Sequence, residues 1–298
     1  MEHVLLSSTG RLARVELSEA YAAARAAQVQ HSRAAHDVIV SAAPTAAGVG
    51  VVTSAGRALR LPLDGLPMLG DGAWSLAEAP DAEAVLPLGD GGRADAAVAV
   101  FSLDLDAAPL ALGTRQGVVK RVTPEYKGWD DWEVIALKDG DAVVGAGLAD
   151  NADDLVFITS NAQLLRLAAR DARPQGRAAG GMAGIKLAEG ATVLAFAAVG
   201  KDATDRALVA TLATGPRPDA ALTAKVTPLA LYPVKGRATG GVRCHRFLKD
   251  QDRLFLAWAG LPPARAADAD GGFRNLPALD ERRDGTGTRV YASFASLG

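Results

Sequence analysis

The sequence predicts an all-β molecule built from repeated hairpins, and two internal repeats support this prediction. In the first repeat, an apolar strand ends near a Thr, a short turn follows, and a hydrophobic pair leads to a cation. Copies of this phrase occupy residues 5–14, 51–60, 112–121 and 157–166. Successive copies begin about 45 to 60 residues apart, a spacing that is typical of repeat architectures.

Each copy has the features of a β-hairpin. In the third copy, the β-rich run ends at Thr114, Gly117 allows a turn with a positive φ, and a second run carries Lys120 and Arg121. A lone hairpin cannot bury its apolar face in water, so the copies must stack against one another. Four-stranded units repeated at this interval favour a propeller-like closed ring.

The second repeat is a glycine-rich loop followed by a strand. Gly176, Arg177, Gly180 and Gly181 recur 60 residues later as Gly236, Arg237, Gly240 and Gly241. Each loop leads to a strand that carries a further cation, which is Lys186 in the first copy and Arg246 in the second. Near the chain end, residues 285–290 form the only other hairpin-like trace, and we assign them to a thin sixth unit.

Length and composition narrow the class of protein. A chain of 298 residues could hold two ordinary domains, but a single ring of repeats also fits. An apolar content of 49% indicates a globular protein, and the longest apolar runs are too short to cross a membrane. Residues 1–14 do not resemble a signal peptide, and Cys244 is the sole cysteine, so we expect a cytoplasmic location. Because the first repeat begins near Met1, we expect the chain to be a piece of a longer protein.

Charge is segregated along the chain, although the net charge is only −2. Residues 64–106 contain nine acids and one base, whereas residues 163–186 contain five bases and one acid. Residues 225–249 contain six bases and no acid. Such patches decide whether a phosphate backbone can dock, so we expect one basic and one acidic sector of the ring.

The repeats resemble a known family. The Thr-x-x-Gly-x-x-Lys-Arg hairpin of residues 114–121 is similar to the repeat in the C-terminal domain of the A subunits of bacterial type IIA topoisomerases, DNA gyrase and topoisomerase IV. The closest matches are residues 113–147, 174–187 and 235–248. The resemblance covers nearly the whole chain, strongly from about residue 109 to 260.

The resemblance implies a six-bladed β-pinwheel, in which neighbouring blades exchange strands and a basic rim binds and bends double-stranded DNA. We place the six blades at residues 1–45, 46–106, 107–150, 151–200, 201–260 and 261–298. No catalysis and no cofactor are expected in this domain. The resemblance implies that the whole enzyme uses ATP and Mg in other domains. Its cleavage domain and its ATPase subunit would be the protein partners of this domain, and the enzyme would be associated with the nucleoid.

The gyrase box distinguishes the two enzymes of this family. Its heptapeptide is Gln-Arg-Arg-Gly-Gly-Lys-Gly, and the nearest candidates here, residues 30–36 and 175–181, do not match it. This difference favours topoisomerase IV over a divergent gyrase as the parent enzyme.

The repeat cations are the candidate DNA-binding residues, because Arg and Lys are the side chains that contact phosphates. The main candidates are Arg115, Lys120, Arg121, Arg166, Arg170, Arg173, Arg177, Lys186, Lys225, Lys235, Arg237, Arg243, Arg246 and Lys249. Weaker candidates are Arg11, Arg14, Arg57 and Arg60. The paired glycines at 180–181 and 240–241 either form tight corners or let the backbone approach phosphate closely.

Other patterns point away from catalysis. The histidines His3, His31, His36 and His245 lack metal-ligand spacing. No complete dinucleotide fingerprint, phosphate loop or nucleophile elbow occurs. We expect Tyr21, Tyr126, Tyr232 and Tyr291 to be packing or rim residues, and Trp129 and Trp132 to cap a blade. Two alternatives stay open: a protein-interaction propeller that docks a basic partner on the acidic sector, and, less favoured, a propeller enzyme.

Overall fold

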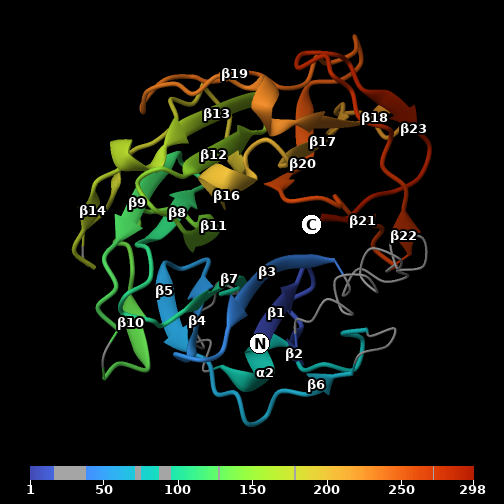
Figure 1. The fold of residues 1–298 in the computed structure, drawn as a ribbon. Coiled ribbons are helices and arrows are strands. Elements are labelled where there is room, and N and C mark those ends of the chain that lie inside the picture. The colour runs from blue at the N-terminus through green and yellow to red at the C-terminus, as the bar shows by residue number, and fades with distance from the viewer. Residues whose placement is uncertain (17–37, 71–74, 87–94, 127, 178, 271) are drawn as a thin grey trace.

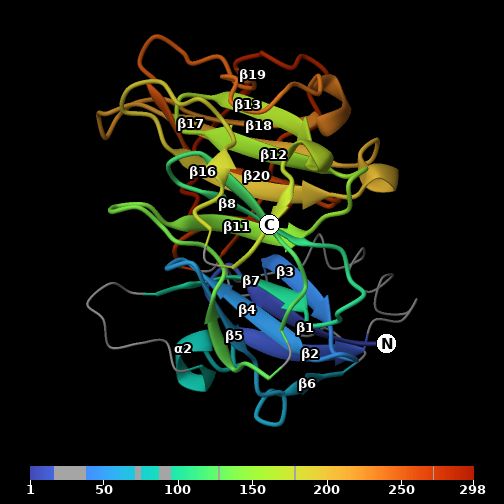
Figure 2. The ribbon, with the colours of Figure 1, turned by 90° about the vertical axis from the view of Figure 1, so that its left-hand side faces the viewer.

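Six β-sheets, set as blades around one axis, make up the computed structural model (Figure 1). The structure describes residues 1–16, 38–70, 75–86, 95–126, 128–177, 179–270 and 272–298. The predicted all-β ring of six blades is confirmed. Seen from the side, the sheets stack one above another through the molecule (Figure 2).

The first three blades each combine a hairpin with an inner and an outer strand. Blade 1 has the order β3-β1-β2-β6, blade 2 the order β10-β5-β4-β7, and blade 3 the order β11-β8-β9-β14, with β15 also on β9. Their bounds are β1 Glu2–Ser7, β2 Leu12–Glu16, β3 Ile39–Pro44, β4 Val49–Thr53, β5 Arg57–Arg60, β6 Met68–Leu69, β7 Ala97–Ser102, β8 Leu110–Thr114, β9 Val118–Val122, β10 Asp131–Glu133, β11 Val143–Leu148, β14 Pro174–Gln175 and β15 Met182–Ala183. The short helix α2 (Ala82–Val85) follows β6.

The last three blades continue the ring. Blade 4 has the order β16-β12-β13-β19, blade 5 the order β20-β17-β18-β23, and blade 6 the three-stranded order β22-β21-β24. Their bounds are β12 Asp154–Thr159, β13 Gln163–Ala168, β16 Val193–Val199, β17 Leu208–Thr214, β18 Leu222–Pro228, β19 Val242–Arg243, β20 Arg253–Gly260, β21 Ala266–Ala267, β22 Phe273–Arg274, β23 Thr288–Val290 and β24 Ser296–Leu297. Short 3-10 turns lie at η3 (Ala169–Asp171), η4 (Lys201–Ala203) and η5 (Leu229–Leu231).

Each of the first five blades borrows its outer strand from the segment that follows the next blade's hairpin. The segment after the blade 4 hairpin supplies β14 and β15 to blade 3, and the segment after the blade 5 hairpin supplies β19 to blade 4. Each of the expected ranges 46–106, 107–150, 151–200 and 201–260 therefore holds three strands of its own blade and also the outer strand or strands of the preceding blade, whereas the described part of range 1–45 holds only β1, β2 and β3.

One expectation for the sixth blade is wrong. Residues 285–290 do not form its hairpin, because β23 pairs with β18 and so completes blade 5. Blade 6 is instead built from β21, β22 and the chain-terminal β24.

The recurring Thr stabilises the hairpin turn in the second, third and fourth copies, whereas Ser7 Oγ accepts the corresponding hydrogen bond from Arg11 N at 3.0 Å in the first copy. Thr114 Oγ1 accepts a hydrogen bond from Val118 N at 3.1 Å, and Thr159 Oγ1 accepts one from Gln163 N at 3.0 Å. Gly117 has a φ of 84°, and the non-glycine Ala162 at the equivalent place has a φ of 59°. The hydroxyl therefore satisfies an amide that the left-handed turn would leave unpaired.

The hydrophobic core lies between blades, as stacking of hairpins requires. Between blades 3 and 4, for example, Phe157 and Phe196 of blade 4 lie in one cluster with Ala111 and Val119 of blade 3, and the two rings meet edge to face with centroids 4.9 Å apart. The inner strands β3, β7, β11, β16, β20 and β24 surround a cavity of about 450 Å³ on the ring axis. Val38 and Ala267 pack together and join the last blade to the first.

Candidate nucleic-acid interface

Four of the predicted DNA-binding cations are inside the protein. Lys120, Arg121 and Lys225 are at most 1% exposed, and Arg166 is 8% exposed. The sequence prediction that these side chains face DNA is therefore corrected: both faces of their strands are covered by neighbouring blades.

The buried lysines bind backbone carbonyls of exchanged segments. Lys120 Nζ donates to the carbonyl oxygens of Arg177 and Ala179, the latter at 2.7 Å. At the same position of blade 5, Lys225 Nζ donates to Cys244 O at 2.9 Å and to Arg283 O. Burial lowers the pKa of each lysine to about 8.

The buried arginines also donate hydrogen bonds to backbone carbonyls. Arg121 donates to Ala169 O at 3.0 Å and to Ala149 O at 2.8 Å. Arg166 donates to Tyr232 O at 3.1 Å and forms an ion pair with Asp154 at 2.8 Å. These contacts tie each hairpin to the chain that enters or leaves the next blade.

The weaker candidates in blades 1 and 2 are also engaged within the protein. Arg14 Nε donates to Leu66 O at 3.1 Å, and Arg60 donates to Trp129 O and Tyr126 O at 3.2 and 3.3 Å. Arg11 pairs with Asp81 at 3.2 Å, and Arg57 pairs with Asp131. The repeated cation thus holds the segment that follows the next blade's hairpin in place on the cation's own blade.

The remaining main candidates lie at the surface. Those that are exposed are Arg115, Arg170, Arg173, Lys186, Lys235, Arg243, Arg246 and Lys249, and those that are half-buried are Arg177 and Arg237. Most of them belong to three successive exchanged segments, residues 174–187, 233–249 and 279–291, which we call the outer belt. Its strands β14, β19 and β23 lie on the periphery of the ring (Figure 1).

Neighbouring segments of the outer belt are joined by backbone hydrogen bonds. Lys186 N donates to Thr239 O at 2.9 Å, and one blade further Arg246 N donates to Gly285 O at 3.0 Å. Arg237 Nη1 adds a bond to Ala183 O at 2.8 Å. The cations of consecutive blades are therefore carried on one continuous structure.

The glycine corners set the course of the belt. Gly181 and Gly241 have φ values of 77° and 74°, and a Cβ on Gly241 would lie 2.4 Å from Leu164 O. The second residue of each glycine pair is thus needed for a tight corner against the neighbouring strand. Gly180 and Gly240 have more room, with nothing nearer than 3.4 Å to an added Cβ.

A third copy of this corner was missed in the sequence. Gly287 has a φ of 69°, and its added Cβ would meet Ala224 O, just as Gly181 meets the backbone of β9. The signal was the spacing Arg-x-x-x-Gly-x-Arg, which residues 237–243 and 283–289 share. The copies are separated by 46 residues instead of 60, so a search at fixed offset does not detect it.

The aromatic residues near the belt have structural contacts. The Arg177 guanidinium lies 3.4 Å from the centroid of the Trp129 ring, a cation–π contact that holds the first belt loop. Trp132 is buried against Phe101 and Tyr126. Tyr232 is also buried, whereas Tyr291 is 95% exposed, and Tyr21 lies outside the described residues.

The histidines show no common site. His245 is buried and contacts Thr211 Oγ1, Thr223 Oγ1 and Thr286 O, each at 3.0 Å. Burial lowers the pKa of His245 to about 4. His3 bonds to Met1 O, and His31 and His36 lie outside the described residues. Among the residues that are described, no three His, Cys, Asp or Glu side chains gather as metal ligands.

The exchanged segments of the first blades have the opposite charge. Residues 61–86 contain five acids and no base, while residues 233–252 contain five bases and two acids. In the last belt segment, Arg282 pairs with Asp280 at 3.0 Å and Arg246 pairs with Asp284 at 3.1 Å. The net positive charge of the outer belt is therefore concentrated in its segments on blades 3 and 4. None of the described helices has the length and apolar content of a membrane span.

Comparisons with known proteins support one family. A profile described as "DNA gyrase C-terminal domain, beta-propeller" matches residues 51–73, 153–199 and 223–255. The A subunit of DNA gyrase from Deinococcus deserti is 35% identical over 136 residues, a match that covers 43% of this chain and 16% of the relative. The chain thus spans about a sixth of the length of this relative. Gyrase A subunits of Mycobacterium tuberculosis and Staphylococcus epidermidis are 33% and 30% identical over 154 and 149 residues, which cover 50% and 49% of this chain and 17% and 16% of the relatives.

Two solved structures have the same fold. A C-terminal domain of DNA topoisomerase IV has a TM-score of 0.69 at 19% identity, with 98% of this chain and 89% of that chain covered. A DNA gyrase A C-terminal domain has a TM-score of 0.67 at 18% identity, with 99% and 98% covered. The two scores are too close to separate one enzyme from the other.

Proposed function

We propose that this chain, which is a β-pinwheel domain of the kind found at the C terminus of type IIA topoisomerase A subunits, binds duplex DNA along its outer belt and bends it. The observation that carries the proposal is the row of exposed cations on hydrogen-bonded belt segments. Lys186, Lys235 and Arg243 are exposed, and none of them forms an ion pair with another described residue.

Binding would be directed at the DNA backbone. Arg and Lys side chains displace counterions from phosphates, so log affinity should fall against log salt with a slope of about −0.9 per phosphate contacted. Such contacts position a duplex without reading its sequence. Bending a site of a few tens of base pairs costs on the order of 1–6 kcal/mol, which contacts along a curved belt can offset.

The parent enzyme is the finer question. The missing gyrase box favours topoisomerase IV, but the sequence relatives are gyrase A subunits by name. We therefore propose a gyrase A-type domain that lacks the gyrase box. The second candidate is the corresponding domain of topoisomerase IV. The cleavage domain of the same polypeptide is a proposed partner in the cytoplasm, together with the ATPase subunit, which would bring ATP and Mg.

A mobility-shift titration of a 40-base-pair duplex over a salt series tests DNA binding. The double variant Lys235→Glu with Arg243→Glu should weaken binding and reduce the salt slope by about 1.8, the value for two lost phosphate contacts. The matched control is Lys201→Glu with Arg206→Glu, which changes the charge equally at exposed sites outside the belt. The proposal would be overturned if the protein did not bind the duplex, if binding did not depend on salt, or if both double variants lost the same amount of DNA affinity.

A protein-interaction domain is the second function to consider, because the sector of residues 64–106 contains nine acids and one base. A basic protein partner would use this sector. The same belt variants separate the two functions, since they should leave binding of a basic partner intact.

A further inference from the structure

Tyr291 departs from the repeat that surrounds it. It lies four residues after the corner glycine Gly287, just as Ile185 follows Gly181 and His245 follows Gly241. Ile185 and His245 are 4% and 1% exposed, whereas Tyr291 is 95% exposed. The exposure of an aromatic ring at a position that is buried in the other two copies must have a physical cause.

The cause is the long hairpin loop of blade 5. In blade 3 the hairpin turn is three residues long, and Ile185 packs on its glycine, Gly117. In blade 5 the loop between β17 and β18 comprises residues 215–221, so the corresponding tight turn is absent. The displaced chain leaves an open pocket of about 410 Å³ between this loop and β23.

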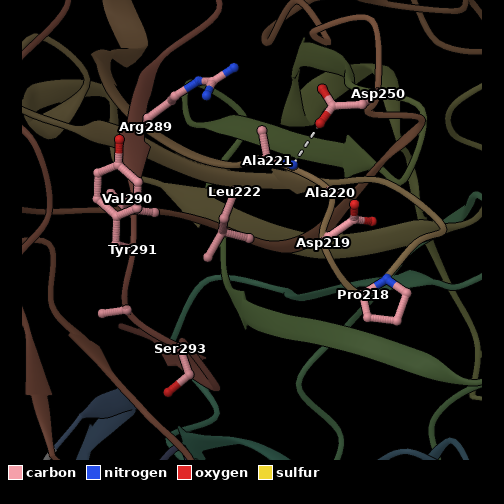
Figure 3. Close-up of a pocket in the computed structure, with 11 residues that line it drawn as sticks. Pro218, Asp219, Ala220, Ala221, Leu222, Asp250, Arg289, Val290, Tyr291 and Ser293 are labelled. Carbon is pink, nitrogen blue, oxygen red and sulfur yellow. Dashed lines mark hydrogen bonds between the residues drawn. The ribbon is translucent and has the colours of Figure 1, made fainter.

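The pocket combines an aromatic face, apolar walls and charges. Arg289, Val290 and Tyr291 form one wall, and Pro218 and Asp219 lie across from them (Figure 3). Arg289 also borders an adjoining groove that contains the exposed cations Arg217 and Lys249. Arg289 has no ion pair with a described residue, whereas Asp250 accepts a hydrogen bond from Ala221 N at 2.7 Å and Asp219 pairs with Arg217 at 3.5 Å.

We propose that this pocket accepts an unpaired base of DNA that is bound on the outer belt, an inference that rests on the DNA-binding function proposed above. The base would stack on the Tyr291 ring, because aromatic faces bind unstacked bases without regard to sequence. Arg289 and Lys249 would contact the adjacent phosphates. The carboxylates of Asp219 and Asp250 would accept hydrogen bonds from base amino groups and would repel phosphates from that side.

The pocket lies at one end of the outer belt, and this position determines which DNA structures could place a base in it. A duplex that follows the belt from blade 3 to blade 5 reaches β23 last, and β23 carries Arg289. A gap, a bulge or a frayed end in the duplex would then place a free base against Tyr291. Intact duplex would have no base to offer and would pass over the pocket.

The experiment compares an intact 40-base-pair duplex with the same duplex carrying a three-nucleotide bulge that contains 2-aminopurine. Fluorescence anisotropy should show about tenfold tighter binding of the bulged duplex, the ratio that one stacked base can supply. The 2-aminopurine emission should be quenched on binding. Tyr291→Leu should remove the preference and the quenching, and Tyr291→Phe should keep both.

Affinity for the intact duplex separates the two proposals. We expect both Tyr291 variants to bind intact duplex with the affinity of the unchanged protein. If the unchanged protein binds bulged and intact DNA equally well, the pocket proposal is overturned and the DNA-binding function is not. Retention of the preference by Tyr291→Leu would overturn it as well. Failure to bind either DNA would overturn the DNA-binding function together with this inference. A pocket that binds a protein segment instead of a base would also give equal affinities for bulged and intact DNA.

Discussion

At the residue scale, identical residue types in one repeat have two separate roles. Lys120 and Lys225 are buried clamps on backbone carbonyls, whereas Lys186 and Lys235 are exposed. The sequence predicts the strand on which each cation lies, because apolar alternation and turns mark the hairpins. It does not predict burial, because both faces of β9 and β18 are covered by chain segments distant in sequence.

His245 makes the stability of the domain depend on pH. Its pKa is lowered from 6.5 to about 4 in the folded protein. Between these two pH values, His245 is therefore protonated in the unfolded chain but neutral in the folded protein. The free energy of unfolding should therefore fall as pH drops from 6.5 to 4, by up to about 3 kcal/mol. Urea unfolding at pH 7 and pH 4.5 measures this difference.

His245→Asn is the informative variant for that prediction, since it keeps hydrogen-bonding capacity but does not titrate. It should unfold more easily at pH 7 yet lose the part of the pH dependence that His245 causes. An equal pH dependence in both proteins would show that other groups are responsible.

At the element scale, the hairpins and glycine corners could be predicted and the strand exchange could not be derived from the residues. Thr114 and Gly117 specify their turn locally, and the paired glycines mark a corner by spacing alone. The partner of an exchanged strand is set by contacts such as Gln163 with Arg243, which are eighty residues apart in sequence. Only the family resemblance pointed to this arrangement.

The belt corner at Gly241 should not tolerate a side chain. Gly241→Ala places a Cβ against Leu164 O and forces a φ of 74° on alanine, so the free energy of unfolding should fall by about 1–3 kcal/mol. Thermal unfolding followed by circular dichroism measures the loss. Gly236→Ala is the matched control, because nothing lies within 4 Å of its added Cβ, and it should change stability little.

At the scale of the whole molecule, charge divides the ring. The exchanged segments of blades 3 and 4 are basic, and residues 61–86, which serve blade 1, are acidic. A duplex held by electrostatic contacts should therefore follow only part of the perimeter.

Partial contact predicts bending with little chiral wrapping. Plasmid relaxed and ligated with this domain bound should show only a small change in linking number, while a short duplex should migrate as bent. A large constrained change would indicate full wrapping instead, and would contradict the division of the belt by charge.

Strand exchange also determines where this chain can be cut. A fragment that ends after residue 200 contains the hairpin of blade 4 but not β19, so β13 would present an unpaired edge to other chains. A fragment that runs past residue 249 retains β19 and leaves blade 4 complete, while the exposed edge moves to blade 5. No cut between two hairpins therefore leaves every retained blade complete, because each of the first five blades needs the segment that follows its successor's hairpin.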